Sequence, residues 1–181
     1  MIFARCIDEV MELKELTDKT LEMFECKNTN ELKEKILSAC INNETTKFDS
    51  FLNLINGDLE TDYLQKIFQY YEADRKSKGQ DYTPKSLAKL VSMLSYDEKE
   101  ETCLDMCCGT GALTIQKWKE DKDLQFELEE YDENVIPFLL FNMMIRNIKA
   151  IVRQKDVLQD ETFKEYSIRK GDKFGICEVI K

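Results

Sequence analysis

Histidine is absent from this 181-residue sequence, and only two prolines and six glycines occur in it. Without histidine the chain cannot form a Ser-His-Asp or Cys-His catalytic group, so enzymes of these classes are excluded. The absence also removes the commonest metal ligand, and the seven cysteines show no paired Cys-x-x-Cys spacing,. We therefore expect no metal site, and we expect the cysteines to be reduced thiols that pack as small apolar side chains.

Long hydrophobic runs and a basic amino-terminal segment are also missing. No apolar run approaches the roughly 20 residues needed to span a bilayer. The first residues, MIFARCIDEVMELKEL, show neither a basic start nor a small-residue cleavage site,. These features predict a cytoplasmic protein without a membrane segment. The net charge of −10 repels DNA and RNA, so we expect nucleic acid to be held only together with a partner,.

What is present divides the chain into two regions. Residues 1–76 carry apolar side chains at helical spacing, and Asn56-Gly57 interrupts the pattern,. The aromatic residues of this region are more typical of helical core and boundary positions than of base stacking. From residue 77 onward strands alternate with helices, which is typical of an open α/β sheet. We predict a helical N-terminal region over residues 1–76 and an α/β core over residues 77–181.

Within the predicted core, Pro84 suits the first turn of a helix that Thr83 caps. The buried stripe of this helix is expected at Leu87, Leu90, Val91 and Leu94. Strands are predicted over residues 101–106, 124–131, 149–154 and 173–180, and helices over residues 112–120 and 134–147. We expect a short parallel sheet with helices on both faces and with the last strand as an open edge.

The strongest local signal is the stretch CLDMCCGTGALT, residues 103–114. A strand that ends near Asp105 runs into Gly109 and Gly111, and a helix follows. Glycines let the backbone turn sharply and approach a ligand closely. The third glycine of a dinucleotide fingerprint is replaced by Thr114, and no Gly-Lys-Ser/Thr follows. The sequence therefore disfavours both a dinucleotide-binding loop and a phosphate-binding P-loop. It also disfavours an ordinary nucleotide-binding α/β protein.

Acidic residues also follow the next two predicted strands. Glu130 ends one strand, where an acid can accept both hydroxyls of a ribose, and Asp156 follows another, where an acid can accept from an adenine amino group,. Three acids at successive strand ends match an uncharged adenosyl ligand better than a pyrophosphate. The competing interpretation is a set of surface carboxylates in an acidic chain.

Three ordered segments, DYTPKSLAKLV, LDMCCGTGALTI and EEYDENVIPFLLFNMMIRNI, resemble consecutive motifs of the N6-adenine DNA methyltransferases. The resemblance is closest to the modification (M) subunits of type I restriction-modification systems. It implies a Rossmann-like class I methyltransferase core with a truncated parallel sheet, and S-adenosylmethionine as the cofactor. The cofactor-binding residues that it implies are Tyr82, Thr83, Pro84, Asp105, Cys108, Gly109, Thr110, Gly111, Glu130 and Asp156.

Two departures from the family pattern bear on function. Met106 and Cys107 replace a proline and an alanine of the glycine loop, while Cys108 matches a family cysteine that packs beneath it, so we interpret the cysteine pair as packing. The family's Asn-Pro-Pro-aromatic motif, which holds and stacks the target adenine, is missing, because the chain contains no Pro-Pro and the predicted last strand runs to Lys181.

Catalytic residues therefore stay unassigned, and two functions stay open. One is an adenine-specific DNA methyltransferase, an M-like subunit that acts on DNA as a homodimer or with another restriction-modification subunit. The other is a catalytically inactive module that binds S-adenosylmethionine or a protein partner.

Overall fold

The computed structural model describes residues 2–71, 83–95 and 101–181. Its first part is entirely helical, as the apolar spacing predicts. The helices are α1 (Ile2–Met23), α2 (Thr29–Ile41), α3 (Thr45–Leu54) and α4 (Tyr63–Tyr71). The side chain of Asn28 caps α2 by accepting from the backbone N–H of Glu31,. The predicted break at Asn56-Gly57 is confirmed, since both residues adopt positive φ between α3 and α4.

A five-stranded sheet forms the second part, in the order β1-β2-β3-β4-β5. Its strands are β1 (Thr102–Met106), β2 (Gln125–Glu130), β3 (Ala150–Asp156), β4 (Glu161–Arg169) and β5 (Ile176–Val179). The first three strands are parallel, and their crossovers contain α6 (Ala112–Glu120) and α7 (Ile136–Ile145). The last two strands pair antiparallel. The predicted α/β class is therefore confirmed, while the prediction of a wholly parallel sheet is wrong.

The antiparallel part of the sheet has a local cause. Only four residues separate β3 from β4, whereas a parallel connection needs a crossover of about a dozen residues or more,. The turn is tight because Asp156 accepts the backbone N–H groups of Leu158 and Gln159, and Asp160 adopts positive φ. The predicted last strand exists as β5, but β4 had no counterpart in the prediction. The edges of the sheet are β5 and β1.

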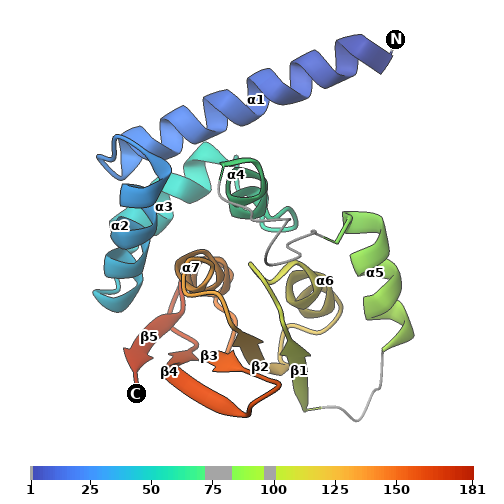
Figure 1. The fold of residues 1–181 in the computed structure, drawn as a ribbon, viewed down its shortest axis with the longest axis vertical. Helices are drawn as coiled ribbons and strands as arrows, with labels where there is room; N and C mark the ends of the chain where they lie inside the picture. The colour runs from blue at the N-terminus through green and yellow to red at the C-terminus, as the bar shows by residue number, and fades with distance from the viewer. Residues whose placement is uncertain (1, 72–82, 96–100) are drawn as a thin grey trace.

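Helices cover one face of this sheet, not both. Figure 1 shows α6 and α7 on the same side, with the N-terminal helices beyond α7. Neighbouring strands align Cys103, Phe126 and Ala150 in register, and Phe126 and Ala150 are fully buried on the covered side. The alternate row carries charged side chains on the other side. In the described part of the chain no helix covers that second face, so the prediction of helices on both faces is wrong.

The helical region and the sheet share one hydrophobic core. Phe141 of α7 makes edge-to-face contacts with the rings of Phe24, Phe48 and Phe51, at centroid distances of 5.9, 5.1 and 5.2 Å. All four side chains are buried. The core is therefore continuous from the N-terminal helices to α7. The predicted boundary at residue 76 lies outside the described residues and stays a prediction.

Helix α5 (Lys85–Leu94) lies against α6 with a face that the periodicity did not predict. Ala88 and Ser92 are the buried side chains, and the predicted stripe is exposed, up to 78% at Leu94. The buried positions are small because close approach of two helices leaves little room for larger side chains. Pro84 lies in the N-cap position, one residue before the helix, so its predicted first-turn place is also wrong. None of the described helices has the length and apolarity that crossing a membrane requires.

Candidate functional site

The glycine loop, residues 107–111, connects β1 to α6 through an irregular backbone. Cys107, Gly109 and Gly111 adopt φ values of 58°, 59° and 95°. Two backbone hydrogen bonds hold the loop, from Cys108 N to Glu129 O at 3.1 Å and from Gly111 N to Cys108 O at 3.0 Å. The loop is therefore tied to the neighbouring strand β2 by its own backbone.

The conformation and surroundings of Gly111 favour glycine at the start of α6. It is the N-cap residue in left-handed conformation, and a Cβ there would lie 2.8 Å from Met143 Cε and 3.1 Å from Leu139 Cδ1. Both neighbours belong to α7. The loop thus packs directly against the helix that follows the second strand. The left-handed backbone favours glycine, and any side chain there would also have to displace the tips of Met143 and Leu139,.

The three predicted acids lie at the carboxyl-terminal ends of the parallel strands. Asp105 lies near the end of β1, and Glu130 and Asp156 are the last residues of β2 and β3. Since these strands are parallel neighbours, their carboxyl ends lie together, where open α/β sheets bind ligands,. The arrangement favours the interpretation as a site over that of scattered surface carboxylates.

Glu130 is joined to the glycine loop by a hydrogen bond. Its Oε2 accepts from the backbone N–H of Gly109 at 2.9 Å, and its Oε1 accepts from that of Asp132 at 2.8 Å. Burial raises the pKa of Glu130 even though these donors favour the charged form,. A carboxylate offers about four acceptor positions, so lone pairs remain for a further donor such as a sugar hydroxyl.

Asp105 is hydrogen-bonded to the helix that follows the loop. Its Oδ2 accepts from the hydroxyl of Thr114 at 2.7 Å, which ties the end of β1 to the first turn of α6. Burial raises the pKa of Asp105, and the hydrogen bond from Thr114 opposes that shift. Thr114, the residue that replaces the third glycine of a dinucleotide fingerprint, therefore has a structural partner in this chain.

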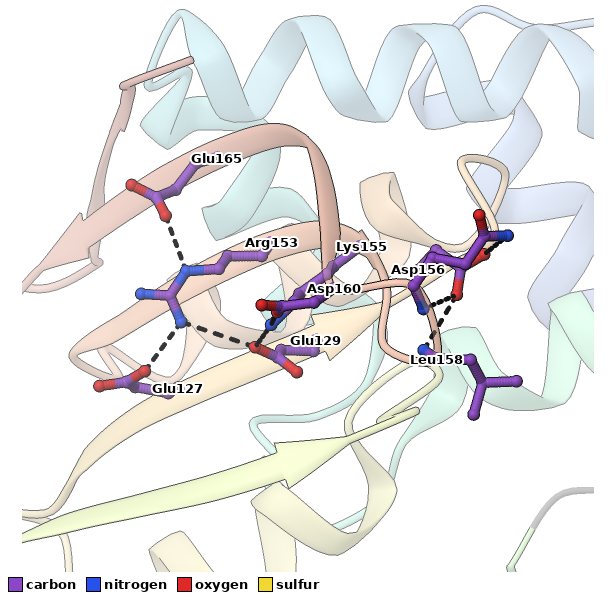
Figure 2. A network of polar contacts seen from close by, with 9 residues as sticks. Glu127, Glu129, Arg153, Lys155, Asp156, Leu158, Asp160 and Glu165 are labelled. Atoms are coloured by element: carbon purple, nitrogen blue, oxygen red, sulfur yellow. Dashed lines mark hydrogen bonds and ion pairs between the residues drawn. The ribbon is translucent and has the colours of Figure 1, made fainter.

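Asp156 is engaged in the turn that follows it, as Figure 2 shows. Its Oδ1 accepts from the backbone N–H groups of Leu158 and Gln159 at 3.0 and 3.1 Å, and its Oδ2 accepts from Gln159 Nε2 at 3.1 Å. The acid thus shapes the β3–β4 turn at the edge of the site. Its predicted contact with an adenine amino group stays a prediction, and would use the remaining lone pairs of Oδ2.

The open face of the sheet beside Asp156 carries a network of paired charges (Figure 2). Arg153 bonds to Glu127 at 2.8 Å and to Glu165 at 2.7 Å, and Lys155 bonds to Glu129 at 3.0 Å and to Asp160 at 2.8 Å. Arg153 also lies 3.9 Å from Glu129, so it has three acidic partners, and Lys155 has two. The network gives no basic surface for a nucleic-acid backbone.

The remaining predicted cofactor residues are placed unevenly. Tyr82 lies outside the described residues, Thr83 is half-buried, and Pro84 is exposed before α5. Thr110 is buried, and its hydroxyl donates to Asp62 Oδ2 at 2.6 Å, so its side chain points into the interior. No sequence pattern associates Asp62 with the site, because it lies 48 residues before Thr110 in the helical region.

Only Cys108 of the predicted packing pair has the surroundings of a packing residue, and the prediction is wrong for Cys107, which is exposed. Cys108 is buried under the loop, and burial raises the pKa of its thiol well above the ordinary value. Cys107 is exposed, yet burial of its sulfur and the acids Glu130 and Asp105 raise its pKa too. Neither thiol is therefore activated as a thiolate. Among residues 2–71, 83–95 and 101–181, no cluster of three or more His, Cys, Asp or Glu side chains could hold a metal ion.

We expect Cys107→Ala to change the free energy of unfolding by no more than about 0.5 kcal/mol, because the side chain is exposed,. Cys108→Asp should lower it by about 3 kcal/mol or more, since it buries an unpaired charge beside Asp105 and Glu130,. Chemical denaturation of the two variants measures both values. Stoichiometric zinc in the purified protein, lost in Cys107→Ala, would contradict the packing role.

Comparison with known proteins places these features in a family. The family model described as N-6 DNA Methylase matches residues 56–176. The type I restriction enzyme MjaVII methylase subunit of Methanocaldococcus jannaschii is 28% identical over 119 residues, 65% of this chain and 19% of that protein. The MjaIX methylase subunit of the same organism is 26% identical over 181 residues, 87% of this chain and 32% of that protein.

The chain spans less than a third of the length of these curated relatives. No solved structure matches it. The matched segment contains the glycine loop and all three acids, and it also contains Asp62 and α4. Since the family model covers more than half of the sequence, the chain belongs to the N-6 DNA methylase family.

Proposed function

We propose that this chain binds S-adenosylmethionine and forms the cofactor half of an adenine-N6 DNA methyltransferase of the type I modification-subunit kind. The observation that carries the proposal is the hydrogen bond from the Gly109 N–H to Glu130, which makes the glycine loop and the acid one unit. When bound, S-adenosylmethionine supplies an electrophilic methyl group to a nucleophile. The core is then a class I, Rossmann-like one, in which β1, β2 and β3 present their carboxyl ends to the adenosyl group.

The residues present fit such a ligand. Glu130 has lone pairs free for a ribose diol, while the peptide groups around Gly109 allow close approach because no side chain stands there,. The site is also rich in carboxyl groups, because Asp105 and Glu130, both half-buried, lie near the carboxyl ends of neighbouring parallel strands. A negative site suits a ligand that carries a sulfonium cation better than one that carries phosphates.

Glu130→Ala should weaken S-adenosylmethionine binding roughly 5- to 150-fold, because a lost charged acceptor costs about 1–3 kcal/mol. The variant also removes the partner of the Gly109 N–H. Isothermal titration calorimetry gives both dissociation constants. The matched control is Glu133→Ala, an exposed acid three residues further on, which should bind like the wild type.

The pH dependence of binding checks the same assignment. Burial raises the pKa of Glu130, so the group takes up a proton at a higher pH than a free glutamate and then loses an acceptor position,. Wild-type affinity should fall as the pH is lowered through that raised pKa, and Glu130→Gln should lose this part of the dependence. No binding by the wild type, or equal binding by Glu130→Ala, would show that the proposal is wrong.

The alternative function, a catalytically inactive binding or interaction module, is favoured by one observation. The 181 residues contain no Pro-Pro and hence no Asn-Pro-Pro-aromatic motif. A base amine is a weak nucleophile and needs acceptors fixed beside the methyl group. The open sheet edge at β1, where Leu104 and Met106 are exposed, fits a chain that works with a second polypeptide or a second copy,.

We therefore expect the purified 181-residue chain alone not to methylate DNA. The absent acceptor motif leaves the adenine amine unpolarised, and the net charge of −10 weakens DNA binding at physiological salt,. The measurement is incubation with labelled S-adenosylmethionine and unmethylated DNA, followed by digestion and analysis for N6-methyladenine. Incorporation over many turnovers per molecule would instead establish the isolated chain as a complete methyltransferase.

A further inference from the structure

A buried carboxylate, Asp62, joins the helical region to the glycine loop. It precedes α4, and only 8% of its surface is exposed. Its Oδ2 accepts from the hydroxyl of Thr110 at 2.6 Å, and its Oδ1 accepts from Asn142 Nδ2 at 2.9 Å and from the backbone N–H of Gln65 at 2.8 Å. One side chain thus contacts three separate elements: α4, the loop and α7.

Thr110 is held from a second direction by the same network. Asn142 Nδ2 donates to the backbone oxygen of Thr110 at 3.0 Å as well as to Asp62. The position of Thr110, between Gly109 and Gly111, is therefore determined by both its hydroxyl and its carbonyl. Thr110 is the next residue after Gly109, whose N–H Glu130 accepts, so holding Thr110 restricts where that N–H can lie.

Arg146 completes the network and balances its charge. Its guanidinium donates to the backbone oxygens of Leu59 and Thr61 at 2.8 and 3.0 Å, and to Asn142 Oδ1 at 2.9 Å. Burial lowers the pKa of Arg146 to about 10, which leaves it a cation at neutral pH. Burial also raises the pKa of Asp62, and Arg146 and the three hydrogen-bond donors oppose that shift.

Helix capping alone does not account for this arrangement. A cap needs one side-chain oxygen, as Asn28 shows at the start of α2, and a neutral residue supplies it without the desolvation cost of a buried charge,. At Asp62 the second oxygen accepts from Thr110, and the charge lies with Arg146 in the interior. The buried charge is thus directed at the glycine loop as well as at the helix.

We propose that Asp62 is a positioning residue of the cofactor site, which holds Thr110 so that the Gly109 N–H and the Glu130 carboxylate keep the geometry that receives the ligand. The helical region then contributes a residue that positions the cofactor site. The identity of the ligand, S-adenosylmethionine, rests on the proposed function. The positioning itself is a property of the ligand-free protein and is tested separately.

The test compares Asp62→Asn and Thr110→Val with the wild type. Asp62→Asn keeps the shape and one capping oxygen. Thr110→Val replaces only the hydroxyl by a methyl group and leaves the hydrogen bonds of Arg146 in place. Amide hydrogen exchange by NMR, without ligand, should show about tenfold faster exchange at Gly109 and Gly111 in both variants. Calorimetry should show S-adenosylmethionine affinity lowered by about the same factor.

The matched control is Asn28→Ala, which removes a helix cap from the same helical region without touching the loop. Asn28→Ala shows how much amide exchange at Gly109 and Gly111 rises when only the stability of the helical region is reduced. Equal changes at Gly109 and Gly111 in Asp62→Asn and Asn28→Ala would overturn the positioning role. If the wild type binds no S-adenosylmethionine, the proposed function fails, and the exchange measurement still decides the role of Asp62.

Discussion

Phe141→Ala should lower the free energy of unfolding by about 3–5 kcal/mol, because it empties the centre of the shared core. The ring is fully buried on α7 and contacts Phe24, Phe48 and Phe51 in edge-to-face geometry. These partners come from the helical region, so the cavity would open between that region and the helix α7 that packs on the sheet. Denaturation in urea followed by circular dichroism measures the loss.

Leu158→Ala is the control for this effect, since Leu158 is 95% exposed and should cost no more than about 0.5 kcal/mol,. A loss for Phe141→Ala as small as that of the control would contradict a continuous core. The same curves test the proposed division near residue 76. One transition for the wild type would show that the two regions unfold together, and two transitions would support separate domains.

Gly111→Val should destabilise the protein by about 2–5 kcal/mol, through two causes that add. A β-branched residue at φ 95° is strained by about 1–2 kcal/mol,. The new side chain would also meet Met143 and Leu139 of α7, and overpacking of this kind costs about 1–3 kcal/mol,. Denaturation measures the sum, and under the proposed function the affinity for S-adenosylmethionine falls as well.

Gly57→Val separates the two causes. Gly57 has φ 73°, and a Cβ there would meet nothing within 4 Å, so this variant carries the backbone strain alone. It should lose only about 1–2 kcal/mol. Equal losses at Gly57 and Gly111 would show that the glycine loop does not depend on its contact with α7.

Much of the fold was predictable because it rests on neighbouring residues. Apolar spacing predicted α1–α4, α6 and α7, and the first three strands were predicted to within a few residues. Strand β4 was missed because only Tyr166 and Ile168 of its nine residues are fully buried, so charged and polar side chains obscure the alternation. The stripe of α5 was misassigned because periodicity shows that a helix has an apolar face but not which face its neighbour covers.

For the candidate site, the local sequence determined which glycines and acids are present, and the tertiary structure decided which side chains hydrogen-bond to the loop. Gly109, Gly111 and the acids at the strand ends were predictable, since turn geometry and strand order depend on short stretches of chain. The link from Asp62 to Thr110 spans 48 residues, and that to Asn142 spans 80. No periodicity or turn rule connects positions so far apart. Only packing of the helical region against α7 brings the carboxylate of Asp62 within hydrogen-bond distance of the loop. Because both partners are buried, water cannot replace either of them in this hydrogen bond,.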